Sequence, residues 1–325
     1  MRRNAPRRAA AVLLGVAVLA GQPAAAAPRV VASVKPVHSL VAGVMGDVAT
    51  PALLVSGGRS PHTHSLAPSD AAGLTEADLV VWVGPALEAF LTRPVANLVE
   101  PSATLRLTEA DGVRLLETRD SGVWAGDRAH DQVADGRAEA ADGAAGAADR
   151  PPPDRTDPHI WLDPANAEAI VGAVAERLQR LDPGNAETYA ANAAEMRERI
   201  AAVDARVREI VAPVRDLPHA VFHDAYHYFQ RRYDLNAVGS VTLSPDRQPS
   251  ARRIQAIRET LRQRETACIF REPQFAPDLV RTVAEGTPVR VGVLDPLGAA
   301  LEPGPGLYPA LMRKLARSLR DCLAG

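Results

Sequence analysis

Short apolar runs alternate with longer amphipathic stretches over most of the 325-residue chain. The apolar runs predict β-strands at residues 30–33, 51–55, 79–83, 220–222, 237–241, 267–270 and 289–293. The amphipathic stretches predict helices at residues 36–45, 66–74, 87–98, 166–181, 250–264 and 309–322. The run 79–83 is almost wholly apolar, which is typical of a parallel strand covered on both faces. This alternation predicts an α/β fold with parallel sheets.

The longest uninterrupted helical pattern covers residues 182–211. It opens on Asp182 as a suitable N-cap, with Pro183 at the first helical position, and meets no helix breaker before Val211. A helix of that size is about 43 Å long, enough to span a two-lobed protein. We therefore predict βα lobes at 28–181 and 213–325, joined by one long helix at 182–212.

The N-terminus has the pattern of a secretory signal peptide, which we assign to residues 1–27. A basic segment with four arginines is followed by an apolar stretch at residues 9–20 and by small residues at 24–27. The apolar stretch is too short for a transmembrane helix. This predicts an exported protein located in the periplasm.

One internal segment breaks the helix and strand pattern. Residues 121–156 are dominated by Ala, Asp, Gly and Arg and contain a single histidine, His130. Without apolar periodicity they cannot bury a face against the rest of the protein, so we expect a flexible loop within the first lobe.

The charge balance is mildly acidic. The formal charge is −2, and loss of the four signal-peptide arginines makes it −6. This argues against nucleic acid or an anionic membrane surface as a partner. Lys35 and Lys314 are the only lysines among 37 basic residues, which we interpret as compositional bias of the genome.

The two cysteines, Cys268 and Cys322, both lie in the exported part of the chain, where disulfides persist. We expect a disulfide that staples the C-terminal helix onto the sheet of the second lobe. Neither cysteine lies in a paired metal-binding motif.

Three histidines stand in contexts that suggest a shared site. His62 follows a turn, His159 follows Asp157-Pro158, and His223 follows an apolar run. In an open α/β sheet, ligands bind at the carboxyl ends of the strands. Three imidazoles meeting there would form a cage for a borderline-soft divalent cation, most naturally zinc. His38 and His219 are interpreted instead as a polar residue at a helix start and as a surface residue.

Several motifs together resemble the ZnuA type of zinc-binding periplasmic protein, over nearly the whole mature chain. They are GGRSPHTHSLAPSD (57–70), ADLVVWVG (77–84), HIWLD (159–163), VFHDAYHYF (221–229), EPQF (272–275) and LDPLG (294–298). The family consists of solute-binding components of ABC importers for zinc, and also contains manganese-binding relatives. The resemblance implies a non-enzymatic protein that carries Zn²⁺ as its transported ligand and hands it to a membrane permease. We expect it to act as a monomer.

The resemblance also implies the ligand set. The positions that match the family's metal ligands are His62, His159 and His223, and Asp295 matches a carboxylate that can be the fourth ligand. A capping role for Asp295 in the following turn is the alternative. His64 and water are further alternatives for the fourth position.

Two other functions remain open. A manganese-binding member of the same family would replace one imidazole by a carboxylate, whereas this chain keeps three histidines. A secreted zinc metallohydrolase would need a general base near the metal, for which Glu272 is the nearest acid in the motifs. The spacing of His223 and His227 imitates a protease helix, but His223 follows a predicted strand, so only one of the two can face the site.

Overall fold

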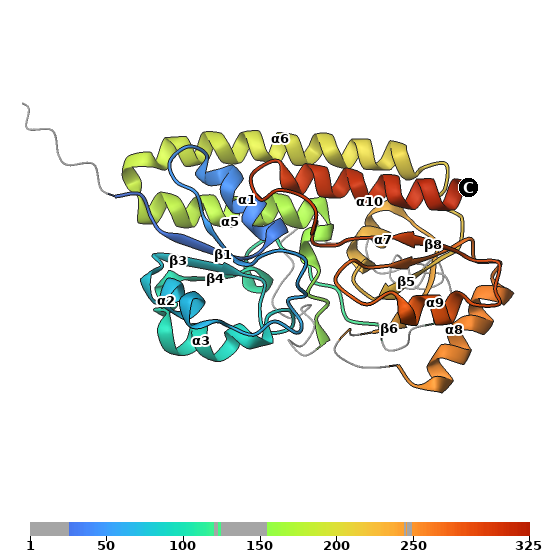
Figure 1. The fold of residues 1–325 in the computed structure, drawn as a ribbon. Helices are drawn as coiled ribbons and strands as arrows, with labels where there is room; N and C mark the ends of the chain where they lie inside the picture. The colour runs from blue at the N-terminus through green and yellow to red at the C-terminus, as the bar shows by residue number, and fades with distance from the viewer. Residues whose placement is uncertain (1–25, 120–122, 125–154, 244, 246–248) are drawn as a thin grey trace, which may run out of the picture.

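The computed structural model describes residues 26–119, 123–124, 155–243, 245 and 249–325, and it contains two parallel sheets beneath a layer of helices (Figure 1). The predicted signal peptide lies outside these residues, apart from its last two. The interior of the predicted loop, including His130, also lies outside them. The described residues at the loop ends have backbone partners, since Val123 bridges Gly239 and Thr156 bridges Glu117. In the described part of the chain, no helix combines the length and the apolar character that crossing a membrane requires.

The first sheet has the strand order β2-β1-β3-β4, with every neighbouring pair parallel. Its strands are β1 (Val30–Val34), β2 (Ala52–Val55), β3 (Leu79–Trp82) and β4 (Thr104–Arg106). β1 and β3 are fully buried, as their apolar runs predict. β4 was not predicted from the sequence, because three half-buried residues with a polar residue at each end give no apolar run.

The second sheet repeats this arrangement with the order β6-β5-β7-β8, again wholly parallel. Its strands are β5 (His219–His223), β6 (Ala237–Thr242), β7 (Cys268–Arg271) and β8 (Arg290–Val293). The predicted α/β fold with two parallel-sheet lobes is therefore confirmed.

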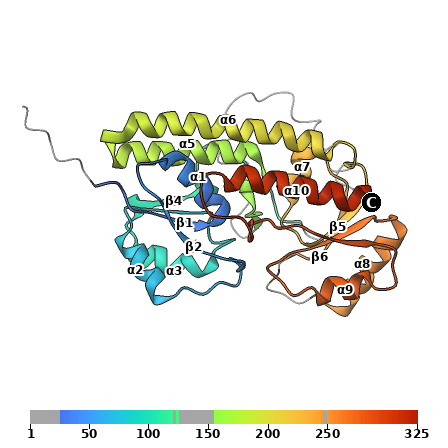
Figure 2. The same cartoon turned by 45° about the horizontal axis from the view of Figure 1, so that its top comes forward.

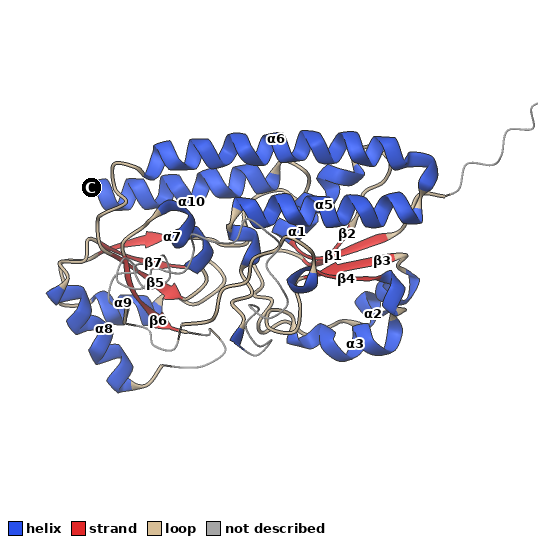
Figure 3. Ribbon diagram, turned by 180° about the vertical axis from the view of Figure 1, so that it is seen from behind, coloured by secondary structure: helices blue, strands red, loops and turns tan. Residues whose placement is uncertain are grey.

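A layer of helices covers the inner faces of both sheets (Figures 2 and 3). Its members are α1 (Lys35–Met45), α5 (Pro164–Leu181), α6 (Ala186–Val211) and α10 (Leu307–Ala324). α6 runs above both lobes and packs on the other three. Its buried residues recur every three or four positions, which gives one continuous apolar stripe: Tyr189, Ala193, Met196, Ile200, Val203, Val207 and Ile210.

The long helix begins three residues later than predicted. A 3₁₀ turn, η8 (Pro183–Asn185), separates it from α5. Asp182 is not the N-cap of α6, because its carboxylate accepts hydrogen bonds from the Asn185 side chain at 2.7 Å and the Tyr189 hydroxyl at 2.8 Å. The remaining 26 residues still make a rod of about 39 Å.

The remaining helices lie mainly on the outer faces of the sheets. They are α2 (Pro68–Glu76) and α3 (Thr92–Leu98) in the first lobe, and α8 (Ala251–Gln263) and α9 (Asp278–Ala284) in the second. α7 (His227–Tyr233) packs instead into the core that the two lobes share, through Tyr228, Phe229 and Tyr233. Further 3₁₀ turns are η1 (Ala89–Leu91), η2 (Pro101–Ala103), η3 (Leu107–Glu109) and η7 (Ile160–Leu162). The predicted helix at 87–98 is divided because Pro94 is tolerated only in a first helical turn, so α3 starts just before it.

One hydrophobic core runs through both lobes. Buried residues of β1 and α1 in the first lobe are continuous, through α6 and α10, with those of β5 and β7 in the second. Two smaller clusters fill the outer faces beneath the outer helices. The lobes are therefore joined by packed helices, and a wide opening between them would expose much of this core.

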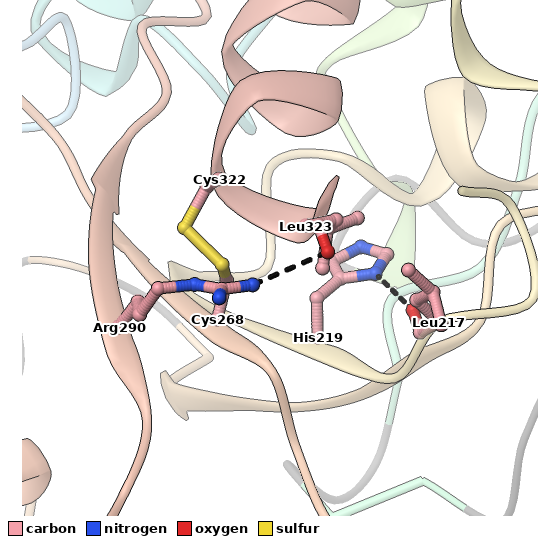
Figure 4. The surroundings of a disulfide bond; sticks show 6 residues. All are labelled: Leu217, His219, Cys268, Arg290, Cys322 and Leu323. Carbon is pink, nitrogen blue, oxygen red and sulfur yellow. Dashed lines mark hydrogen bonds between the residues drawn. A yellow bond between two sulfur atoms is a disulfide. The ribbon is translucent and has the colours of Figure 1, made fainter. Parts of the chain in front are cut away.

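The predicted disulfide is confirmed, with 6.3 Å between the Cα atoms of Cys268 and Cys322 (Figure 4). It links the first residue of β7 to α10, beside a hydrogen bond of 3.2 Å from Arg290 to the carbonyl of Leu323. His219 lies close by and is buried, which corrects its assignment to the surface. It is the first residue of β5, its ring contacts Phe270, and burial lowers its pKa to about 4.

Removing the disulfide should lower the melting temperature by on the order of 5 to 10 °C. The bond closes a loop with a sequence separation of 54 residues, which corresponds to about 4 kcal/mol in the chain-entropy model. Thermal unfolding of the Cys268→Ala/Cys322→Ala variant against the oxidised wild type measures this. An unchanged melting temperature would mean that α10 docks without help from the bond.

Candidate metal centre

The three predicted histidines meet between the lobes. The Nε2 atom of His159 lies 3.4 Å from Nε2 of His62 and 3.4 Å from Nε2 of His223. Among the described residues, these three form the one group whose ligand atoms all lie within 4.8 Å of one another. His159 and His223 are buried, while His62 is partly exposed. The three Nε2 atoms could therefore bind the same metal ion.

The three histidines lie on three different segments of the chain. His62 follows β2 through a turn in which Gly57 adopts a φ of 71°, a left-handed conformation that favours glycine. His159 directly precedes η7, and His223 is the last residue of β5. The ends of β2 and β5 thus place His62 and His223 at the carboxyl edges of the two sheets, as the fold class predicts. His159 lies within reach of both, in the segment before η7.

A buried carboxylate lies behind each of the two buried imidazoles. The Oδ1 atom of Asp157 is 2.8 Å from Nδ1 of His159, and Oε1 of Glu272 is 2.6 Å from Nδ1 of His223. A carboxylate at Nδ1 keeps the proton on that nitrogen and leaves Nε2 free to bind a metal. The two acids therefore fix both the ring orientation and the tautomer that ligation requires.

Burial and these pairs set the protonation of the site. Burial raises the pKa of Asp157 to about 7 and also raises the pKa of Glu272. Burial lowers the pKa of His159 well below its ordinary value, so this imidazole stays neutral. Burial is the largest influence on His223 and lowers its pKa, but the neighbouring carboxylates, with Glu272 first among them, together outweigh it and raise the pKa of His223.

Sequence reasoning missed the role of these acids. Asp157 had a local signal, since a side chain two residues before a histidine can reach back to its ring. Glu272 had no such local signal, because it follows β7 whereas His223 ends β5. In the sheet these two strands are neighbours, and Val221 pairs with Phe270. Extending that register by two residues sets His223 opposite Glu272, but only the sheet order shows that β5 and β7 are neighbours.

Asp295 lies close by but is occupied by other partners. Its oxygens accept hydrogen bonds from the backbone amides of Leu297, Gly298 and Ala299 at 2.6–3.1 Å, and Oδ1 accepts another from the Gln274 side chain at 2.7 Å. It does not belong to the three-histidine group. This arrangement matches the alternative considered from the sequence, an acid that caps the following turn.

The other histidines that the structure describes also lie outside the group. The ring of His64 makes an edge contact with Phe90, with 4.8 Å between ring centroids. His227 starts α7, with Nδ1 3.9 Å from an oxygen of Asp157. His38 is buried within α1, and its Nε2 lies 3.0 Å from the carbonyl of Pro51.

The histidine group is open on one side and packed on the other. The open side is a cleft of about 460 Å³ whose walls include Arg119, Asp157 and Asp224. Arg119 donates a 2.7 Å hydrogen bond to Asp224, the residue after His223, and its guanidinium lies 3.9 Å from the ring centroid of Trp124. On the packed side, Trp161, Phe275 and Leu297 leave space for little more than a water molecule. A ligand therefore enters from the cleft.

Solved structures with the same fold include proteins described as binding zinc or manganese. TroA from Treponema pallidum, described as a periplasmic zinc-binding protein, superposes with a TM-score of 0.72 at 21% identity, over 91% of this chain and 99% of its own. FpvC from Pseudomonas aeruginosa, solved with Mn²⁺, gives a TM-score of 0.73 at 22% identity, over 92% and 99%. A zinc-bound deletion mutant of ZnuA gives 0.71 at 22% identity, over 91% and 98%. At these identities the likeness concerns the fold, which accommodates more than one metal.

Sequence relatives are more specific. A protein from Brucella suis biovar 1 (strain 1330), named high-affinity zinc uptake system protein ZnuA, is 40% identical over 308 residues, covering 91% of each chain. Its namesakes from Paracoccus denitrificans (strain Pd 1222) and Yersinia pestis are 38% and 33% identical, each match covering 96% of both chains. The model of the ZnuA family, periplasmic component A of a zinc-uptake complex, matches residues 30–322. The chain belongs to this family.

Substituting the carboxylate behind a histidine should weaken metal binding without removing a ligand. We expect Glu272→Gln to lower the affinity for zinc about 10- to 100-fold, because the amide holds the His223 ring and tautomer less well than the carboxylate. Competition with a chromogenic chelator measures the change. Glu259→Gln, an exposed position on α8, is the matched control and should bind as the wild type does. Equal affinities for the two variants would show that Glu272 does not orient the ligand.

Proposed function

We propose that this protein captures Zn²⁺ in the periplasm and delivers it to the membrane permease of an ABC importer. The observation that carries the proposal is the convergence of three imidazole Nε2 atoms within 4.8 Å of one another. Membership of a periplasmic zinc-uptake family supports the location and the partner. The signal peptide expected at residues 1–27 is consistent with the same compartment.

The ligand set favours zinc over manganese. Imidazole nitrogens suit zinc, whereas manganese prefers sites rich in carboxylate and water oxygens. Within the described residues the group consists of histidines alone, and the carboxylates of Asp157 and Glu272 are engaged by imidazole Nδ1 atoms. We propose His62, His159 and His223 as the protein ligands. Water from the cleft completes the tetrahedron, since Asp295 is held by three backbone amides.

Capture and release follow from the packing. Two imidazoles are oriented in advance by Asp157 and Glu272, so little ordering is left to occur when zinc arrives. The continuous core beneath α6 opposes a wide hinge opening. Release to the permease therefore uses a small shift of one lobe against the other.

A catalytic role is less well supported. A zinc hydrolase needs a general base beside the metal-bound water. Glu272, the acid considered for that role, is buried on the packed side of the site and bonded to His223. We therefore propose capture as the function, with the cleft serving as the route by which zinc enters.

Removing any one of the three imidazoles should lower the affinity for zinc more than removing one of the carboxylates that lie behind two of them. We expect His62→Ala, His159→Ala and His223→Ala each to weaken zinc binding by at least about 100-fold, since each removes one of three protein ligands. Isothermal titration with a competing chelator measures the affinities. His64→Ala is the matched control, two residues from His62 and turned toward Phe90, and should keep full affinity. Three variants with wild-type affinity would exclude the site.

The affinity for zinc should fall as the pH drops from about 7 to about 5. Zinc binds neutral imidazole, and the Glu272 carboxylate raises the pKa of His223 above its ordinary value. The affinity for zinc therefore reaches its maximum above the pKa of His223 and declines by up to about tenfold per pH unit below that pKa. His159 does not take part, because burial keeps it neutral. Titrations in buffers of different ionisation enthalpy should show at least one proton released per zinc bound, and a pH-independent affinity would contradict the proposal.

A further inference from the structure

Lysine is scarce in this chain, and its two lysines occupy opposite environments. Lys35 and Lys314 stand among 37 basic residues, the rest of which are arginine. Lys314 is exposed on α10. Lys35 is the first residue of α1, directly after β1 in the first lobe, and only 6% of its surface is exposed. A buried lysine in a chain that otherwise uses arginine indicates a place where the ammonium group itself is needed.

The Lys35 ammonium is bound entirely by the other lobe. Its Nζ donates to the carbonyls of Gly298 at 3.3 Å, Ala299 at 2.8 Å and Leu301 at 2.9 Å. These residues belong to the segment between β8 and α10 of the second lobe. An ammonium has three donors that can point to three converging carbonyls, whereas the planar fork of arginine cannot. Lys35 thus ties the end of β1 to the opposite lobe.

The same segment is held from its second-lobe side by Asp295. While Lys35 binds carbonyl oxygens of residues 298–301, the Asp295 carboxylate binds the amides of Leu297, Gly298 and Ala299. The two buried charges are thus connected through the polar groups of one short stretch of backbone. Asp295, the acid that matches a metal ligand in sequence, is thus held by the backbone of this segment and is not part of the three-histidine group.

Hydrogen bonds and contacts connect this segment to two zinc ligands. The carbonyl of Pro296 accepts a 2.9 Å hydrogen bond from the indole of Trp161, whose ring lies 5.5 Å from that of His159. On the other side Gln274 bonds Asp295. Gln274 stands two residues after Glu272, the partner of His223. A displacement of the segment would therefore disturb ligands on both sides of the cleft.

We propose that Lys35 is a positioning residue: its three hydrogen bonds, called here the pin, hold the lobes at the separation where the three imidazoles can share one zinc ion. Zinc release then requires these hydrogen bonds to break. The inference rests on the proposed function. An ammonium stripped of its partners in a dry site is unstable, so Lys35 must become hydrated when its carbonyls move away. The open state is therefore one in which Lys35 reacts with solvent reagents.

The two lysines of the wild-type protein suffice to test this. Limited reductive methylation, followed by peptide mass spectrometry, gives the reactivity of Lys35 relative to Lys314 in the zinc-loaded and in the chelator-stripped protein. We expect Lys35 to be protected at least tenfold relative to Lys314 when zinc is bound, and to lose several-fold of this protection on stripping, while Lys314 stays constant. Equal protection of Lys35 in both states would overturn the proposal, because the hydrogen bonds of Lys35 would then not respond to zinc.

A variant test uses the rate of zinc release to excess chelator. We expect Lys35→Met and Lys35→Arg to release zinc at least several-fold faster than the wild type, with Lys314→Met as the matched control that does not. Unchanged release from folded Lys35→Met would contradict the pin. If that variant does not fold, the labelling of the wild type decides.

Failure of the pin and failure of the proposed function give different results. Calorimetry with zinc alone comes first. If the protein did not bind one equivalent of zinc tightly, zinc capture itself would be refuted. Tight binding of one equivalent, combined with Lys35 protection that does not respond to zinc, would refute the pin and leave capture intact.

Discussion

Burial of one helix layer against both sheets is the constraint on which the rest of this structure depends. α1, α5, α6 and α10 supply the apolar surface that makes the cores of the two lobes continuous. His62 and His159 come from segments of the first lobe and His223 from the second, so their Nε2 atoms can meet only if the lobes keep a fixed relation. Hydrophobic packing far from the cleft thus helps to keep the imidazoles within the roughly 0.5 Å of productive geometry that a functional site requires.

The electrostatics of the centre are those of a site built for a dication. Asp157 and Glu272 are buried acids, each facing an imidazole, and burial raises the pKa of both. A Zn²⁺ ion bound to the imidazoles would supply the two positive charges that make two ionised carboxylates acceptable there. Without the ion, protons supply part of that charge. Metal and protons therefore compete for the same groups, which links zinc capture to the acidity of the surroundings.

Much of the architecture could be predicted from apolar runs, and most of the site from three histidine motifs. Long or wholly apolar elements such as β3 and α6 carry their own signal, whereas β4, α7 and α9 are short and mixed. Pairings between distant segments were not accessible: Glu272 reaches His223 only through the order of the strands. His219 was misassigned because the residue after a proline looks exposed until α10 and the disulfide are seen to cover it.

The packing of α1 against α6 and α10 has a consequence for how this chain acquires its structure. α1 occupies residues 35–45 and α10 residues 307–324, so contacts that complete the first lobe span almost the whole sequence. Contacts of such separation close slowly, because a long segment must be ordered before they form. The first lobe therefore cannot bury all of its apolar surface until the last helix is in place. It stays exposed to proteases and aggregation until the last helix arrives, and a lesion near the C-terminus would damage both halves of the molecule.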